Sequence, residues 1–196
     1  MSISIKKQSG TSLIEVLVAV FVVSVGLLGV ARMELFAKNS NYEAVQRTTA
    51  AMIANEIMQK IRANPSQLAS YVGQTVGSGS LTFPTANCKD GTTACTPAQV
   101  VTWDLYEWEQ LLIGSAEKAG SANTGGLVNP RGCITSTAAS GAAGEYTVAI
   151  AWRGNSPMTN PTSTTCGNGA NLYGTTNEEY RRVITITFFV SDDGVS

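Results

Sequence analysis

The chain has 196 residues, of which 14% are charged, and its formal net charge is -1. This balance gives no overall electrostatic attraction to nucleic acid or to anionic membranes. The sequence has no histidine and contains neither G-x-S-x-G nor G-x-x-x-x-G-K, so the common arrangements of hydrolases and nucleotide-binding proteins have no candidates. We therefore expect a protein that is not an enzyme and that needs no cofactor or metal.

The first predicted element is an apolar helix near the N-terminus. Residues 13–31 would extend roughly 28 Å as a helix, which matches the hydrocarbon core of a bilayer. Lys6 and Lys7 precede this run, so the positive-inside rule puts the N-terminus in the cytoplasm and the chain from Arg32 onward outside. Glu15 lies within the run, where an unpaired charge costs about 2.5–3.5 kcal/mol near the bilayer centre. It therefore needs a cationic partner.

The residues around this acid resemble a known processing signal. Residues 10–17 read Gly-Thr-Ser-Leu-Ile-Glu-Val-Leu, and this stretch resembles the prepilin signal of type IV pilins and type II secretion pseudopilins. The resemblance implies that a prepilin peptidase cuts between Gly10 and Thr11 and methylates the new N-terminus. It also implies that Glu15 pairs with the N-terminal amine of a neighbouring subunit. Thr11 departs from the large apolar residue that is usual at its position.

Two other interpretations of the N-terminus stay open. Gly29-Val30-Ala31 fits the small-x-small site of an ordinary secretory signal that is cleaved before Arg32, and the apolar run also fits a plain single-span anchor. A secretory signal normally has a shorter apolar region without an acid. A plain anchor does not require this spacing of glycine, leucine and glutamate.

The predicted helix continues beyond the apolar run. Residues 31–63 contain neither proline nor glycine, and Asn64-Pro65 ends the helix because the residue before a proline is pushed out of the helical region. Apolar residues recur at steps of three and four on one side, which should face a domain core: Ala50, Ile53, Ala54, Ile57 and Ile61. Four segments are expected: a leader over 1–10, a transmembrane and assembly helix over 11–31, a packed half of that helix over 32–63, and an exported globular domain over 64–196.

A second, amphipathic helix is predicted after a stretch of loops. Residues 66–95 are rich in glycine, serine and threonine and hold only short apolar pieces such as residues 81–83, so we expect loops there with one short strand. Thr96-Pro97-Ala98-Gln99 is a capping box with proline at the first helical position, so a helix should begin there and end at Gly114. Its apolar residues lie on one face at steps of four, three and four: Val101, Leu105, Trp108 and Leu112.

The other large side chains of this helix point to no chemistry. Trp108 lies on the apolar face and is expected in the core, whereas Trp103 lies off that face, which leaves an exposed ligand contact open. The carboxylates of Asp104, Glu107 and Glu109 are expected to be solvated on the helix surface.

Two strands are predicted in the last third of the chain. Residues 145–153 and 181–190 alternate large apolar residues with small or polar ones, which is the pattern of half-buried strands. Antiparallel pairing of these strands, packed against the apolar side of residues 50–61, would complete an α+β fold. The long polar loop between them, residues 154–177, is of the kind that is often functional.

All four cysteines lie in the exported part. An even number in such a domain indicates disulfides. Three connectivities are possible, and we favour Cys88 with Cys95 and Cys133 with Cys166, because Asp90-Gly91 favours a tight turn within the first pair. A zinc site is the alternative, although histidine is absent and the spacing of the first pair is wide for zinc ligands. In pilins, which the chain resembles, a disulfide likewise bounds a loop near the C-terminus.

The resemblance extends to minor pilins of the PilV type. It rests on the capped segment TPAQVVTWDLYEWEQLL, the strand EYTVAIAWRG and the closing RRVITITFFVSDDG. It implies a subunit of the bacterial inner membrane with its C-terminal domain in the periplasm and, later, a place in the pilus, at its tip. The implied partners are other minor pilins, the major pilin and a large tip adhesin, with which it would prime pilus assembly and so support adhesion and twitching motility.

Two other functions stay open. A minor pseudopilin of a type II secretion system shares the same N-terminus, and the exported domain could itself be a module that binds a surface or DNA. From Ala63 onward six basic residues face ten acidic ones, which gives -4. This charge disfavours DNA as a ligand, so no nucleic-acid partner is expected.

Overall fold

The computed structural model describes residues 10, 12–89, 94–175 and 177–191. It divides into two units, residues 1–42 and residues 43–196. Helix α1 (Leu13–Ala63) contributes to both units, which confirms one long N-terminal helix. In the first unit, every described side chain from residue 12 to residue 41 is exposed.

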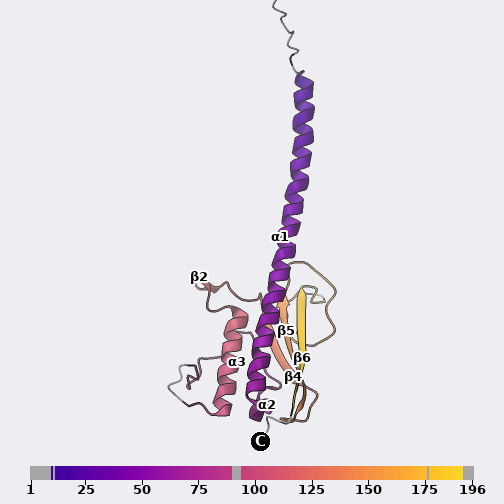
Figure 1. Cartoon of the computed structure of the whole chain (residues 1–196). Helices are drawn as coiled ribbons and strands as arrows, with labels where there is room; N and C mark the ends of the chain where they lie inside the picture. The colour runs from indigo at the N-terminus through magenta and orange to yellow at the C-terminus, as the bar shows by residue number, and fades with distance from the viewer. Residues whose placement is uncertain (1–9, 11, 90–93, 176, 192–196) are drawn as a thin grey trace, which may run out of the picture. The chain divides into compact units, whose positions relative to one another are not determined.

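The second unit combines three helices with a small antiparallel sheet, which confirms the α+β class. In the four-stranded sheet the order is β1-β4-β5-β6, with every pair antiparallel, and β2 and β3 form a separate hairpin. Figure 1 shows β4, β5 and β6 as neighbouring arrows. Beyond α1 the elements are η1 (Pro65–Gln67), α2 (Leu68–Tyr71), β1 (Thr75–Val76), α3 (Pro97–Ile113), β2 (Lys118–Ala119), β3 (Ala122–Asn123), β4 (Arg131–Ser136), β5 (Gly144–Arg153) and β6 (Arg181–Val190).

The core lies where α1, α3 and one face of the sheet meet. Each residue of the predicted apolar side of α1 is buried, and so are the alternating large residues of β5. The other face of β5 is also covered, because Ala149 and Ala151 are buried and the Sγ atom of Cys166 lies 3.6 Å from the carbonyl oxygen of Ala149. The long loop before β6 therefore packs on the sheet.

Helix α3 begins and ends as its sequence predicts. The Thr96 side chain accepts a hydrogen bond from the Gln99 amide, the Gln99 side chain accepts one from the Thr96 amide, and Pro97 occupies the first turn. Gly114 ends the helix with a φ of 64°, and an added Cβ there would lie 1.9 Å from the amide nitrogen of Gly126. Only glycine fits this cap.

The short strands were predicted only in part. The one short strand expected within residues 66–95 is β1, which pairs with β4, and residues 81–83 have no strand structure. Strand β4 itself was not predicted, since it has only six residues and includes Gly132, which weakens the strand pattern. Gly132 has a packing role: an added Cβ would lie 2.6 Å from the Trp108 ring, so α3 packs tightly against the sheet here.

Candidate functional site

The residues of the predicted processing signal lie at the start of α1. Gly10 is exposed, and Glu15 lies in the first turn of the helix with its side chain exposed. An acid in this position is favoured by the positive end of the helix dipole. Thr11, the other residue of the predicted cut, lies outside the described residues, as does the rest of the leader over residues 1–9.

The helix after Glu15 presents apolar side chains on all sides. It is long and apolar enough to cross a membrane, and none of that stretch is buried. Leu13, Phe21, Leu28 and Phe36 are each at least 69% exposed. An apolar surface of this size is not stable in water, so it requires lipid or other helices around it.

Both favoured disulfides are present. Cys88 is bonded to Cys95, and Cys133 is bonded to Cys166, so none of the four sulfur atoms is free to bind zinc. The turn predicted at Asp90-Gly91 lies outside the described residues.

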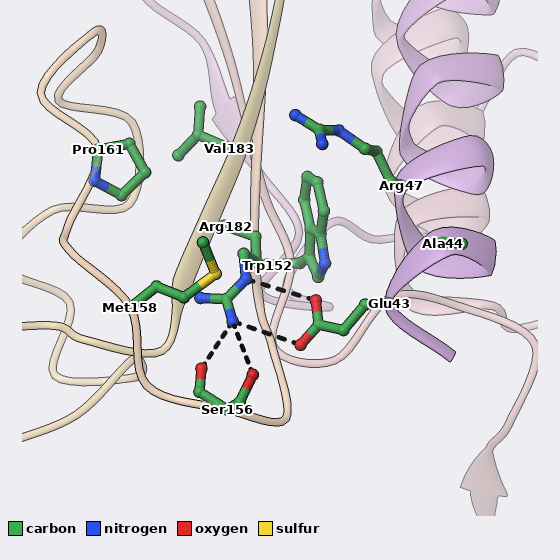
Figure 2. A pocket seen from close by; sticks show the side chains of 9 residues that line it. All are labelled: Glu43, Ala44, Arg47, Trp152, Ser156, Met158, Pro161, Arg182 and Val183. Atoms are coloured by element: carbon green, nitrogen blue, oxygen red, sulfur yellow. Dashed lines mark hydrogen bonds and ion pairs between the residues drawn. The ribbon is translucent and has the colours of Figure 1, made fainter. Parts of the chain in front are cut away.

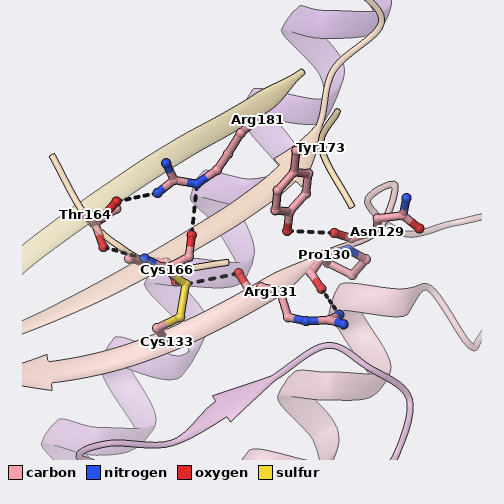
Figure 3. The surroundings of a disulfide bond; sticks show 9 residues. Asn129, Pro130, Arg131, Cys133, Thr164, Cys166, Tyr173 and Arg181 are labelled. Atoms are coloured by element: carbon pink, nitrogen blue, oxygen red, sulfur yellow. Dashed lines mark hydrogen bonds between the residues drawn. A yellow bond between two sulfur atoms is a disulfide. The ribbon is translucent and has the colours of Figure 1, made fainter. Parts of the chain in front are cut away.

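A buried arginine organises the loop that carries Cys166 (Figure 3). Arg181 is 1% exposed, and its Nε donates to the carbonyl oxygen of Cys166 at 3.1 Å. Its other nitrogens donate to the side-chain oxygen of Asn160 and to the carbonyl oxygens of Pro161 and Thr164. No acid within 4 Å pairs with it among the described residues, so carbonyl and amide dipoles stabilise its charge.

Tyr173 fastens the same loop to the residues before β4. Its ring is buried, and its hydroxyl donates to the carbonyl oxygen of Asn129 at 3.0 Å (Figure 3). Burial raises the pKa of Tyr173 to about 12, so the hydroxyl remains a donor at any physiological pH. The sequence suggested neither this role nor that of Arg181.

The prediction for the α3 carboxylates was wrong for Glu109. Its side chain is 0% exposed, and Oε1 accepts the amides of Gly77 and Gly79 at 3.0 and 3.1 Å. Oε2 accepts the amide of Leu81 at 2.7 Å. The segment after β1 thus lies over this side of α3. The burial of Glu109 could have been inferred from its position, because it is four residues after Leu105 and borders the apolar face of the helix.

Asp104 and Glu107 form a second, partly buried charge cluster. Tyr71 donates to Asp104 at 2.5 Å, and Lys60 lies 3.6 Å from Asp104 and 2.7 Å from Glu107. Burial raises the pKa of Asp104, although Tyr71 and Lys60 oppose the shift. Burial also acts to raise the pKa of Glu107, but the bonds from Lys60 and Lys89 outweigh it, so the pKa is lowered. The expectation of full solvation was therefore wrong for this pair as well.

The interpretation of Trp103 as an exposed ligand contact is also wrong. Its ring is 8% exposed, because Phe83 packs edge-to-face on it with ring centroids 5.4 Å apart. The ring of Tyr106 contacts both, with its centroid 5.5 Å from that of Phe83 and 6.0 Å from that of Trp103. Phe83 follows the loop segment that Glu109 holds, so the sequence pattern of α3 alone does not reveal this contact.

A cavity of about 410 Å³ lies between α1 and the end of the sheet. Figure 2 shows Arg182 held by Glu43 and Ser156 on one side of it and Arg47 near the ring of Trp152. The lining is mostly apolar, and among the described residues two of its buried N–H groups have no acceptor: Nε1 of Trp152 and Nη1 of Arg182. The residues around it are Glu43, Ala44, Arg47, Trp152, Ser156, Met158, Pro161, Arg182 and Val183.

Comparison with known protein families matches two regions of the chain. Residues 5–31 match the prokaryotic N-terminal methylation motif, and residues 33–106 match the family described as type IV pilin Tt1218. The chain is a type IV pilin-like protein. No curated protein and no solved structure matches it.

The matches fit the geometry of this pilin-like protein. The methylation motif includes Gly10 and Glu15, and with the exposed apolar part of α1 it fits a membrane-anchored pilin. The pilin match covers the packed part of α1 and ends within α3. Pilin domains are structural rather than enzymatic, and pilins are processed by a prepilin peptidase.

Proposed function

We propose that this chain is a minor pilin that helps to prime type IV pilus assembly at the inner membrane. The observation that carries the proposal is the apolar surface of α1, exposed on all sides and directly behind Gly10 and Glu15. Its partners are other minor pilins, the major pilin and a large tip adhesin. The chain acts as a structural subunit and not as an enzyme, and it supports piliation, twitching motility and adhesion. Within this proposal the chain is a minor pilin of the PilV type.

The four segments have separate tasks in this proposal. Residues 1–10 are the leader, which the prepilin peptidase removes between Gly10 and Thr11. Residues 11–31 first span the membrane and then enter the bundle of helices in the pilus. Residues 32–63 pack on the domain, and residues 64–196 form the periplasmic domain that later lies in the pilus, at its tip.

The physical basis for assembly is the exchange of one apolar environment for another. Lipid tails are as apolar as neighbouring helices, so leaving the bilayer costs the exposed side chains of α1 little. The carboxylate of Glu15 is costly in either environment unless it is paired. The methylated amine of a neighbouring subunit supplies the cation, so Glu15 favours a defined position of the subunit in the assembly.

The mature N-terminus tests the processing step. Mass spectrometry of the protein purified from membranes should find methylated Thr11 as its first residue. An N-terminus at Arg32 would overturn the proposal in favour of a secretory signal.

Deletion of the protein separates the pilus from the secretion system. We expect loss of surface pili with secretion intact. Loss of secretion with normal pili would instead support a minor pseudopilin. Tight binding of the detergent-solubilised chain to DNA or to a surface would support a binding module.

A further inference from the structure

The sheet ends in a long strand with an open side. Strand β6 pairs with β5 from Arg181↔Arg153 to Val190↔Gly144 without interruption, and among the described residues no other strand pairs with it. The strand at the opposite edge, β1, has only two residues. In the part of the chain that the structure describes, β6 is thus the one edge of this sheet that is long enough to take a further strand.

The hydrogen bonds around β5 show which residues of β6 face outward. The Thr137 amide donates to the Glu145 carbonyl oxygen, so odd-numbered residues of β5 bond toward β4 and even-numbered residues toward β6. In agreement, the Gly154 amide, which directly follows β5, donates to the Tyr180 carbonyl oxygen, which directly precedes β6. The odd-numbered residues of β6 therefore direct their backbone groups away from β5. Arg181 already donates its amide to the Glu178 carbonyl oxygen, and the others are Val183, Thr185, Thr187 and Phe189.

This edge has none of the usual protection against pairing. Sheet edges are normally guarded by charges, proline, bulges or short length. Residues 183–190 read VITITFFV, with no charge, proline or glycine, and the register contains no bulge. Phe189, near the end of the strand, is a large apolar residue that is 65% exposed. Among the described residues, cover is found at the start of β6, where Arg182 bonds to Ser156.

The cavity of Figure 2 lies at the start of the same edge. Val183, the first outward-facing residue, lines it together with Met158 and Pro161. Its free polar groups are donors: Nε1 of Trp152, Nη1 of Arg182 and the guanidinium of Arg47, for which no acceptor is found among the described residues. A chain that pairs with β6 could thus place an apolar side chain in the cavity and offer a carbonyl or carboxylate oxygen to these donors.

We propose that the outer edge of β6 binds an extended strand of another pilin-like subunit, with an apolar side chain of that strand anchored in the cavity. The partner is a protein segment because the edge offers alternating N–H and C=O groups, which only a second backbone matches along its length. This inference rests on the proposed function, since it names the surface through which the subunit joins its neighbours.

Thr185→Pro tests the pairing with little effect on the isolated fold. The outward N–H of Thr185 is not used by β5, and its side chain is exposed, so proline should be tolerated at this edge position. Proline removes one donor and obstructs the approaching strand. Thr185→Ala is the matched control, because it keeps the N–H and removes the same side chain.

The readout is the amount of the full-length chain in sheared pili, relative to the amount in the cell. We expect the alanine variant to equal the wild type and the proline variant to fall about tenfold or more, while cleavage after Gly10 is unchanged. Equal amounts of all three forms would overturn this inference and leave the proposed function intact. Absence of the wild type from pili would instead refute the proposed function.

Hydrogen exchange on the wild-type chain gives an answer even if the proline variant does not fold. The amides of Thr185, Thr187 and Phe189 should exchange rapidly in the detergent-solubilised chain. They should become protected when the chain is co-purified with the other pilins of the same bacterium. Unchanged exchange in that complex would overturn the inference, and protection in the chain alone would show that a second copy is the partner instead.

Discussion

A single carboxylate accepts backbone amides of residues 77–81, as the carbonyl oxygens of a neighbouring strand would do in a sheet. Glu109 accepts three backbone amides there, and it is fully buried. The loop beyond, which carries Phe83 over Trp103, begins at this anchor. The order of a segment without regular structure therefore depends on one side chain of α3.

Glu109→Gln should destabilise the domain. A glutamine has one oxygen acceptor, and its amino group cannot accept, so at least one buried amide loses its partner at a cost of about 1–3 kcal/mol. Urea unfolding of the full-length chain in detergent measures this loss. Glu145→Gln, at an exposed position of β5, is the control and should change stability little. Equal stability of both variants would contradict the role assigned to Glu109.

The neighbouring acids Asp104 and Glu107 should respond to pH with opposite signs. The pKa of Asp104 is raised above its usual 3.8, so its contribution to stability is present below that value and is lost as pH rises through the raised pKa. The pKa of Glu107 is lowered from 4.5, so its contribution is present above that value and is lost as pH falls through the lowered pKa.

Asp104→Asn should therefore gain unfolding free energy relative to the wild type as pH rises above 3.8 and through the raised pKa. Asparagine still offers an oxygen to the hydroxyl of Tyr71. Glu107→Gln should show the reverse, losing unfolding free energy relative to the wild type as pH rises through the lowered pKa toward 4.5. Denaturant unfolding at a series of pH values checks both, and parallel curves for the two variants would refute the assignment.

At the scale of elements, α3 packs tightly against the sheet at Gly132. An added Cβ would lie 2.6 and 2.7 Å from two ring carbons of Trp108, so no larger residue fits while the ring keeps its place. Gly132→Ala should cost about 1–3 kcal/mol of unfolding free energy through overpacking.

A second substitution tests the cause of that loss. Trp108→Phe removes the outer ring whose atoms the new methyl group meets. The double variant should then lose less stability than the sum of the two single variants, which shows coupling between the sites. Simple additivity in denaturant unfolding would mean that Gly132 is needed for another reason.

The two disulfides differ in the length of chain that they close. Cys133 and Cys166 are separated by 33 positions, whereas Cys88 and Cys95 are separated by 7. In the chain-entropy model the longer loop is worth about 1 kcal/mol more. Replacing Cys133 and Cys166 with serine should thus lower the melting temperature more than replacing Cys88 and Cys95, and the opposite order would contradict this account.

At the scale of the whole molecule, the long and strongly periodic elements were predictable. Helix α1 and strands β5 and β6 follow from repeats of three to four or of two, and α3 follows from its capping box. Strand β4 escaped because it is short and includes Gly132. The bonds of Glu109 and Arg181 escaped because their partners are backbone groups of loops, whose positions depend on tertiary packing.

Glu15→Ala addresses assembly of the whole subunit. Under the proposed function cleavage depends mainly on Gly10 and should continue, whereas incorporation into pili should fall, because the proposal has the carboxylate pair between subunits. Glu34→Ala is a suitable control, since Glu34 is an exposed acid of the same helix paired only with Lys38. Immunoblots of sheared pili measure incorporation, and equal amounts of Glu15→Ala and wild type would contradict the docking role.

The unprotected edge of β6 also sets a time limit on assembly. A run such as VITITFFV, with high β-propensity and no charge or proline, is the kind of segment that stacks into cross-β fibrils when it remains uncovered. In a subunit that has not yet met its partners, assembly therefore competes with aggregation through β6. Cells that make this protein faster than its partners should accumulate fibrils rather than unassembled subunits in the membrane.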